Sequence, residues 1–576
     1  MTADAASGWR GTVGTWSRRA LDRLEDVRVC WIVLAAASAV YVAVALWLGR
    51  GTTLFVDELN FFTHDRGFRP SALLTPLNGH LVLLQRLLFA VDFKLFGPNF
   101  LVLRLVEVAG VVLVVGLLFE FVRRRIGPAA ALAPAVLLLF LGSGWELNFV
   151  VSGIGNVYAL AAGLAALLAL ERGDSRGDLV ACLALIVAVA SFTLGVAFVV
   201  GAAVLILLEP GARRRLWIPL VPLALYAAWF VWVRTGYVAV PGELPTLDAW
   251  NILLIPNFIA DEASAVAGAL AGLNHNFQPR DVFWVFSTES PYGPVLAAAA
   301  AVALGVRLRR GGRQPLLWAV MAVLLAYWLS LALGFDPHNG RTPTTVRYVY
   351  PGGIMVLLVA AEAARGIALS RVALVVLYVI TALALGANVV RLREGGHFYR
   401  TAATSLRAEL TALELARDHV DPSFVPPLTI SYLAVVRAGR YLAAEKRIGS
   451  PAYSPAELAH QPEATRQVAD RVLVPALRIA VAPPNPHESV RNCRRLGGAQ
   501  SAAAIPVAPP GVRLTSPTGG QVGLRRFATV ATVPVGSVAA GRAVDLRIPA
   551  DRSRRVWQAV VTPAPASLVV CDLSPR

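Results

Sequence analysis

The sequence predicts an α-helical, multi-pass membrane protein of about eleven transmembrane helices, with a water-soluble domain at its C-terminal end. Two observations support this prediction. The chain has 576 residues, of which 56% are hydrophobic and only 15% charged, whereas soluble domains are nearer a quarter charged. The apolar residues also gather in runs of roughly 15–24, the length that spans a bilayer. We expect these runs to be helices, because a helix satisfies its own backbone polar groups in lipid.

The apolar runs give the expected transmembrane helices. The two runs 178–193 and 195–209 could also form one long tilted helix, but the stretch from Ser191 to Gly195 favours a tight break between two. The eleven runs are residues 29–49, 100–122, 128–143, 152–170, 178–193, 195–209, 216–234, 293–306, 315–334, 351–364 and 372–391.

Arginine indicates the orientation. The net charge is +17, and the arginines cluster in short segments between apolar runs, which is typical of cytoplasmic loops and not of a nucleic-acid-binding surface. If the N-terminus is cytoplasmic, every short Arg-rich loop falls on the cytoplasmic side, and merging the two doubtful runs would destroy that agreement. These clusters are Arg123–Arg125, Arg172 with Arg176, Arg213–Arg215, Arg307 with Arg309, Arg310 and Arg313, and Arg365 with Arg371.

The same orientation predicts the domain organisation. Residues 1–28 form a cytoplasmic segment, residues 29–393 form the transmembrane domain with a long external loop at 50–99, and residues 394–576 form an extracytoplasmic α+β tail. The tail is expected to be helical over 394–495, where Ser454-Pro455-Ala456-Glu457 has the form of a capping box. Short Val-rich runs divided by Pro and Gly predict a small β-sandwich over 496–576.

The chain has four cysteines, and their positions suggest different roles. Cys30 and Cys182 lie in apolar runs, where a thiol is inert. Cys493 and Cys571 lie in the tail, where they can form a disulfide bond if the tail is extracytoplasmic, or remain two separate thiols.

Two further segments have helical spacing without being transmembrane. Residues 80–96 alternate apolar residues with Gln85, Arg86, Asp92 and Lys94, which predicts an amphipathic helix on the membrane surface. Residues 252–272 show the same pattern more weakly.

An acidic pair follows the first apolar run. In Val56-Asp57-Glu58-Leu59-Asn60 two adjacent carboxylates stand where a membrane span meets the external surface. A carboxylate tuned by burial can act there as a general base on a substrate hydroxyl, although a solvated start of a loop is the simpler interpretation.

Basic residues stand in the external segments as well. Arg341 and Arg347 lie in the segment from Asp336 to Pro351, where a planar fork of donors suits an anionic phosphate, or where the side chains reach lipid headgroups. His80 is a candidate for contact with a substrate, or for capping and packing.

These motifs together resemble the GT-C glycosyltransferases, in the protein-mannosyltransferase and aminoarabinose-transferase branches. The matching features are the acidic pair in the first external loop, the segment Leu77-Asn78-Gly79-His80-Leu81 through Phe96-Gly97-Pro98-Asn99-Phe100 with Arg104, and the Arg347-Tyr348-Val349-Tyr350-Pro351 element. The resemblance covers residues 29–365 as topology and about 55 residues as motif. The chain departs from it at Asn78-Gly79-His80, where these branches often have a Pro-Pro-Leu type of sequence.

The resemblance implies an inverting transfer of a sugar from a polyprenyl-phosphate donor to a glycan, lipid or protein acceptor, on the outer face of the membrane. The high content of Ala, Val and Arg is typical of a GC-rich bacterial genome and favours a bacterial plasma membrane. Asp57 would be the general base with Glu58 as its neighbour, and Arg341 or Arg347 would bind the donor phosphate. Further candidate substrate contacts are His80, Arg86, Glu146 and Tyr348. Some family members use a divalent cation and others do not; no residue pattern here requires a metal or another cofactor.

Two other functions remain open. A transporter or flippase of envelope lipid or polymer would place charges deep in several spans and show paired repeats, and neither stands out in the sequence. A non-catalytic envelope scaffold would not need the acidic pair. The sequence contains no P-loop, no GxSxG and no HExxH motif.

Overall fold

The computed structural model describes residues 24–55, 57–64, 67–236, 249–277, 286–311, 314–427, 437–497 and 504–574. Val56 and most of the expected cytoplasmic segment 1–28 lie outside the described residues. The chain forms two compact units: the first contains Met1–Arg50, Arg66–Asp92 and Asn99–Tyr399, and the second contains Gly51–Asp65, Phe93–Pro98 and Arg400–Arg576.

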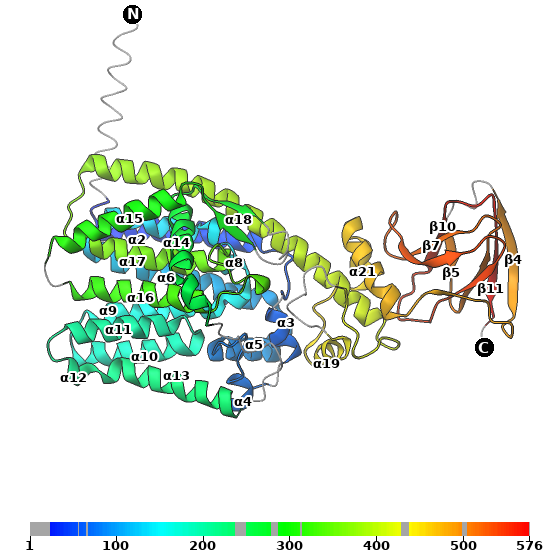
Figure 1. The fold of residues 1–576 in the computed structure, drawn as a ribbon, viewed down its shortest axis with the longest axis horizontal. Coiled ribbons are helices and arrows are strands. Elements are labelled where there is room, and N and C mark those ends of the chain that lie inside the picture. Colours follow the sequence, from blue (N-terminus) through cyan, green and yellow to red (C-terminus); the bar gives the residue numbers. More distant parts are fainter. Residues whose placement is uncertain are drawn as a thin grey trace, which may run out of the picture. The chain divides into compact units, whose positions relative to one another are not determined.

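The first unit is a helical bundle, and each of the eleven apolar runs forms a helix in it (Figure 1). These helices are α2 (Val27–Leu48), α6 (Phe100–Ile126), α7 (Pro128–Leu139), α9 (Ile154–Leu170), α10 (Ser175–Ser191), α11 (Gly195–Leu208), α13 (Trp217–Thr235), α15 (Gly293–Arg309), α16 (Pro315–Leu333), α17 (Val346–Ala363) and α18 (Arg371–Leu415).

By length and composition, eight helices in the described part of the chain can cross a membrane. This number differs from eleven because α7, α10, α11 and α15 have only 12, 17, 14 and 17 residues, while α14 (Asn251–Leu270) is long enough to be included. The chain is a multi-pass membrane protein on either count.

The doubtful segment around residues 191–195 is a break between two helices. Helix α10 ends at Ser191, and α11 begins at Gly195. A Cβ atom at Gly195 would lie 2.3 Å from the backbone of Ala188, so only glycine allows the chain to turn back this tightly. The expectation of two separate helices is confirmed.

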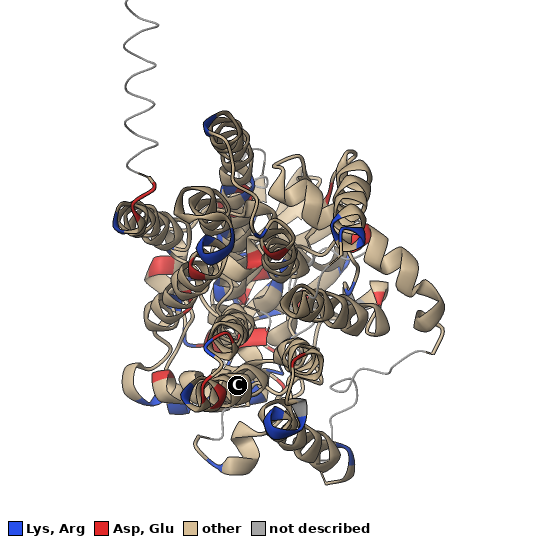
Figure 2. Cartoon of the chain, turned by 90° about the vertical axis from the view of Figure 1, so that its left-hand side faces the viewer, with Lys and Arg blue, Asp and Glu red and all other residues tan. Residues whose placement is uncertain are grey.

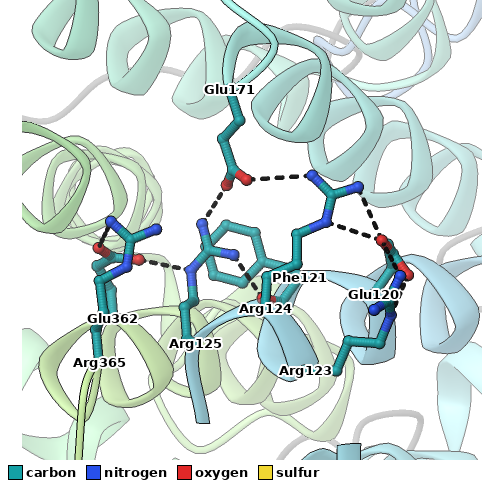
Figure 3. A network of polar contacts seen from close by, with 8 residues as sticks. All are labelled: Glu120, Phe121, Arg123, Arg124, Arg125, Glu171, Glu362 and Arg365. Carbon is teal, nitrogen blue, oxygen red and sulfur yellow. Dashed lines mark hydrogen bonds and ion pairs between the residues drawn. The ribbon is translucent and has the colours of Figure 1, made fainter. Parts of the chain in front are cut away.

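The Arg-rich loops all lie at one end of the bundle, which we call the Arg-rich end. Figure 2 views this end and shows Lys and Arg on the helix ends that face the viewer. Arg125 of α6 has a fully buried side chain and donates to Glu362 of α17 at 2.5 Å, to the Phe121 carbonyl and to Glu171 (Figure 3). Its charge is compensated by two carboxylates, so the contacts join α6, α9 and α17 here.

Helix α14 lies across the opposite end of the bundle. In Figure 1 it runs across the neighbouring long helices. Its first residue, Asn251, donates at 3.0 Å to the Leu333 carbonyl at the end of α16, and the carbonyl of Ala269 accepts from Asn388 of α18 at 2.9 Å. Between them, Ser264 lies against Gly293 at the start of α15. The contacts with α16 and α15 are with helix ends that face away from the Arg-rich end, whereas Asn388 lies within the long helix α18.

The expected external loop 50–99 contains three helices: α3 (Asp57–Thr63), α4 (Pro70–Leu73) and α5 (Leu83–Phe96). Helix α5 corresponds to the amphipathic helix expected over 80–96 and begins three residues later. Helix α3 belongs to the second unit, where the Phe62 ring lies 5.7 Å from that of Phe93 and 6.0 Å from that of Tyr441.

From Arg400 onwards, the second unit contains the last turns of α18 and three shorter helices, α19 (Ala438–Ile448), α20 (Pro455–Ala459) and α21 (Glu463–Ala476). The capping box at Ser454 and Glu457 is present at the start of α20, as expected. Asp470 of α21 is fully buried and accepts from the backbone N–H groups of Arg526, Phe527 and Ala528, which fixes α21 against the strands that follow.

The C-terminal part of the second unit contains two antiparallel sheets, with strand orders β5-β10-β7-β8 and β3-β9-β6-β11-β4. Strands begin before residue 496, so the expected helical segment 394–495 is wrong in its last part. A disulfide bond joins Cys493 of β4 to Cys571 of β11. The strands are β3 (Val481–Ala482), β4 (Val490–Gly497), β5 (Ile505–Val507), β6 (Gly511–Thr515), β7 (Gly520–Arg525), β8 (Val533–Val538), β9 (Ala543–Arg547), β10 (Trp557–Thr562) and β11 (Ser567–Leu573).

Candidate functional site

A tight turn positions His80. Asn78 and Gly79 have positive φ angles of 50° and 80°, and Leu77 and His80 exchange backbone hydrogen bonds of 3.1 and 2.8 Å around them. An Asn-Gly pair is the usual choice for such a two-residue turn, because both residues tolerate positive φ. Arg86 of α5 donates to the carbonyls of Thr75 and Pro76 at 2.7 and 3.0 Å. Arg86 therefore holds the segment that leads into the turn.

His80 is a neutral imidazole in this environment. Its ring packs 4.4 Å from the ring of Phe192, in the break between α10 and α11. Burial, together with the positive charges of Arg341 and Arg347, lowers the pKa of His80 from 6.5 to about 4. Among the described residues, its buried Nδ1 has no hydrogen-bond partner. A neutral imidazole can donate one hydrogen bond and accept another.

Arg347 holds the loop that presents Arg341. Asp336 and Arg341 exchange backbone hydrogen bonds of 3.1 and 2.9 Å around the short helix η3 (Pro337–Asn339). Gly340 closes this turn with a φ of 63°, and its carbonyl accepts from Arg347 Nη2 at 3.1 Å. Because Arg347 lies in the first turn of α17, a rigid helix fixes the position of the loop.

Glu146 and Tyr348 also lie beside Arg347. Glu146 begins the short helix α8 (Glu146–Phe149), and its Oε1 is 3.7 Å from Arg347 Nη1. The Arg347 guanidinium carbon lies 5.4 Å from the centre of the Tyr348 ring. The segment that precedes α8 packs closely against α17, since a Cβ atom at Gly144 would lie 2.9 Å from the Cβ of Tyr350.

The first unit thus brings His80, Arg341, Arg347, Glu146 and Tyr348 together at the end of the bundle opposite the Arg-rich end. We call these five residues the arginine site. It combines two guanidinium groups, one neutral imidazole and one carboxylate, so its formal charge is positive. Arginine binds phosphate oxygens through paired, charge-assisted hydrogen bonds, and the site is therefore suited to an anion of that kind.

Asp57 and Glu58 belong to the second unit and have different environments there. Glu58 is fully buried, and its Oε2 accepts from the backbone N–H of Phe55 at 2.7 Å. Asp57 is half-buried and is the first residue of α3. The Nε2 atom of His64, the residue after this helix, lies 2.9 Å from Arg440 Nη1. Since the Glu58 carboxylate stabilises its own turn, Asp57 is the stronger candidate of the two for chemistry.

The described residues contain no group of three or more His, Cys, Asp and Glu side chains that could hold a metal ion.

Sequence reasoning did not single out Glu262, Tyr327 or Trp328. Glu262 of α14 is fully buried, and the Tyr327 hydroxyl of α16 donates to the Tyr348 carbonyl at 3.3 Å. The signal in the sequence was a carboxylate pair, Asp261-Glu262, within an otherwise apolar helix. A buried acid in such a place is uncommon unless it has a function.

Comparison with known proteins returns no matching family model and no matching curated protein. Solved structures do match. ArnT from Cupriavidus metallidurans bound to undecaprenyl phosphate has a TM-score of 0.43 and 16% identity over 79% of this chain and 96% of that chain. Its apo state has a TM-score of 0.44 and 16% identity over 74% and 90%.

The archaeal oligosaccharyltransferase AglB from Archaeoglobus fulgidus, in complex with an inhibitory peptide and a dolichol-phosphate, has a TM-score of 0.37 and 12% identity over 63% of this chain and 56% of that chain. At these scores and identities, the likeness assigns no role to any residue.

Proposed function

We propose that this chain is a membrane glycosyltransferase, which transfers a sugar from a polyprenyl-phosphate donor to an acceptor of the bacterial cell envelope. The observation that supports it best is the arginine site, in which Arg341 and Arg347 lie near a neutral His80 in a multi-pass membrane protein. A donor of this kind has an apolar tail for the bilayer and an anionic phosphate for the arginines.

The reaction we propose is a direct displacement with inversion. The acceptor hydroxyl oxygen forms a bond to the anomeric carbon while the bond from that carbon to the phosphate oxygen breaks. The bonding electron pair leaves with the polyprenyl phosphate, and the hydroxyl proton passes to the Asp57 carboxylate. No further reactant is needed for this balance.

The arginine site would act on the leaving group. Charge increases on the phosphate as its bond to the sugar breaks, and guanidinium groups already in place stabilise that charge without reorganisation. His80, as a neutral imidazole, can donate a hydrogen bond to the phosphate without adding a third positive charge. Glu146 would compete with the donor phosphate for Arg347, since its carboxylate oxygen is 3.7 Å from that guanidinium.

Asp57 is proposed as the general base, with Glu58 in a supporting role. The half-buried Asp57 is accessible to a substrate hydroxyl, whereas Glu58 is fully buried against the backbone of Phe55. The acceptor would be a glycan, a lipid or a protein on the extracytoplasmic face, with the N-terminus in the cytoplasm and the C-terminal domain outside. The disulfide bond in the second unit is in keeping with that placement.

The test is sugar transfer in membranes that contain the protein, with a panel of radiolabelled polyprenyl-phosphate sugars and envelope extract as the acceptor. We expect wild type to transfer one of the sugars, Asp57→Asn to lose transfer, and Asp261→Asn, an exposed carboxylate change, to retain it. Transfer that survives in Asp57→Asn but not in Glu58→Gln would move the base to Glu58. Movement of labelled lipid across the membrane without transfer would instead favour a flippase.

A further inference from the structure

Strand β4 places three exposed arginines at the edge of a sheet. It is the last strand in the order β3-β9-β6-β11-β4, so among the described residues it has a neighbouring strand on one side only (Figure 1). Its five consecutive residues from Arg491 to Arg495 are all exposed. The disulfide bond between Cys493 and Cys571 joins it to β11 and holds it in place. We call Arg491, Arg494 and Arg495 the β4 arginines.

The β4 arginines lack the charge compensation that other arginines in the two sheets have. Among the described residues, none of the three forms an ion pair. Asp572 lies opposite Arg491 in the strand register, but its Oδ2 accepts a hydrogen bond from Asn492 at 3.1 Å. The sequence contains no acidic residue from position 489 to position 503, so the β4 arginines give this edge a positive charge. The compensated pairs elsewhere are Arg513 with Asp545, Arg526 with Asp551, and Arg547 with Glu488.

The position of Arg494 argues against a further β-strand as the partner of this edge. Arg494 lies opposite Val570, which is 1% exposed and belongs to the core between the sheets. Residues directly opposite each other in antiparallel strands share a face, so Arg494 stands on the core-facing side of the sheet. An inward-pointing charge on an edge strand is a device that prevents another strand from extending the sheet.

The surroundings of the β4 arginines also argue against a lipid surface. Segments that bind a membrane surface insert apolar side chains beside their basic residues. In β4 and β11, by contrast, no large apolar side chain is exposed among the described residues. Arg491 and Arg495 are four residues apart, about 13 Å along a strand. Since guanidinium groups bind carboxylate and phosphate in pairs of hydrogen bonds, this spacing suits several anionic groups along an extended polymer.

We propose that the β4 arginines form a docking surface for an anionic polysaccharide, whose sugar units carry carboxylate or phosphate groups. The surface would hold the protein next to this polymer in the cell envelope. The disulfide bond beside the arginines is in keeping with an extracytoplasmic location, where such a polymer lies. The inference is separate from the proposed sugar transfer, because binding at β4 requires no chemical step.

The test measures binding of the full-length protein, in nanodiscs of zwitterionic lipid, to polygalacturonate as the anionic polysaccharide. Neutral dextran measures binding that does not depend on charge, and phosphatidylglycerol vesicles measure binding to an anionic membrane. The variant Arg494→Gln/Arg495→Gln removes two β4 arginines, and the control Arg542→Gln/Arg554→Gln removes two exposed arginines elsewhere in the second unit. Thermal unfolding and thiol labelling show that each variant is folded and keeps its disulfide bond.

We expect wild type to bind polygalacturonate and not dextran, with a Kd that rises as salt is added, because salt screens contacts between exposed charges. Arg494→Gln/Arg495→Gln should weaken this binding by roughly tenfold or more, and the control variant by less than about threefold. Equal losses in both variants would overturn the proposal and indicate attraction to the net charge of the chain. Absence of polygalacturonate binding by wild type would also overturn it, and vesicle binding in that case would indicate a membrane surface.

Discussion

At the Arg-rich end of the bundle, the buried side chain of Arg125 is surrounded by the carboxylates of Glu171 and Glu362. At the opposite end, the side chain of Arg347 is 29% exposed, and its carboxylate neighbour Glu146 is 3.7 Å away. The first arrangement compensates a charge that the fold has buried. The second leaves a positive site at which an anion can be bound. The same residue type is therefore structural at one end and a candidate for function at the other.

The largest effect that would test this contrast is expected from Arg125→Met. The change leaves Glu171 and Glu362 without their buried partner, and breaking such a pair costs about 3–5 kcal/mol of unfolding free energy. Chemical unfolding in detergent measures it, with the exposed Arg310→Met as a control that should stay within about 0.5 kcal/mol. An unchanged stability of Arg125→Met would show that the network does not support the fold.

Arg347→Gln should have a large effect on sugar transfer and a small effect on stability, unlike Arg125→Met. Removal of a preorganised donor to a developing charge lowers kcat by about 10²–10³-fold. The unfolding free energy should change by no more than about 1 kcal/mol, because the pair with Glu146 is partly exposed. Transfer assays and unfolding of the same preparation measure both. A large loss of stability with little loss of kcat would show that Arg347, like Arg125, is a structural residue.

The stability of the protein should depend on pH through His80, which lies at the end of the bundle opposite the Arg-rich end. Its pKa is about 4 in the folded protein against 6.5 in a free side chain, so the unfolded chain takes up the proton first. Its contribution to stability is therefore complete above pH 6.5 and is lost as the pH falls towards 4, at no more than about 1.4 kcal/mol per pH unit. Thermal unfolding across this range should fall more steeply for wild type than for His80→Gln. Parallel curves would mean that His80 is not held neutral.

The smallest effect is expected from Glu146→Gln. The Glu146 side chain is 22% exposed, so its interaction with Arg347 is worth about 0.2–1 kcal/mol. Removing the carboxylate also removes a competitor for Arg347, and we expect KM for the donor to fall by a few-fold with stability unchanged. A rise in KM would show instead that Glu146 is needed to orient the arginine.

Much of the fold follows from local sequence. Each apolar run forms a helix, because a helix satisfies its backbone polar groups whatever surrounds it. The glycine at position 195 indicated the break, and Ser454 with Glu457 indicated the start of α20. Strand β4 was not anticipated, because most of it is exposed and shows no apolar alternation. Its pairing with β11 places it in the sheet.

The site was predicted less completely than the fold. The sequence named Arg341, Arg347, His80, Glu146 and Tyr348 as separate candidates, and the structure brings them together. It did not name Trp328, since nothing in a tryptophan of an apolar helix shows that its N–H lacks a partner. It did not name Glu262, because the burial of that acid results from the packing of α14 against other helices of the bundle.

The sequence by itself determined where the helices lie, that the Arg-rich loops share one end, and which charged residues stand at the other end. These properties depend on residue type and on spacing along the chain. Only the tertiary structure decided which charges are compensated and which polar atoms are left without a partner. The reason is physical: Arg125 and Glu362, or Glu262 and Trp328, meet only because helices far apart in the sequence pack together.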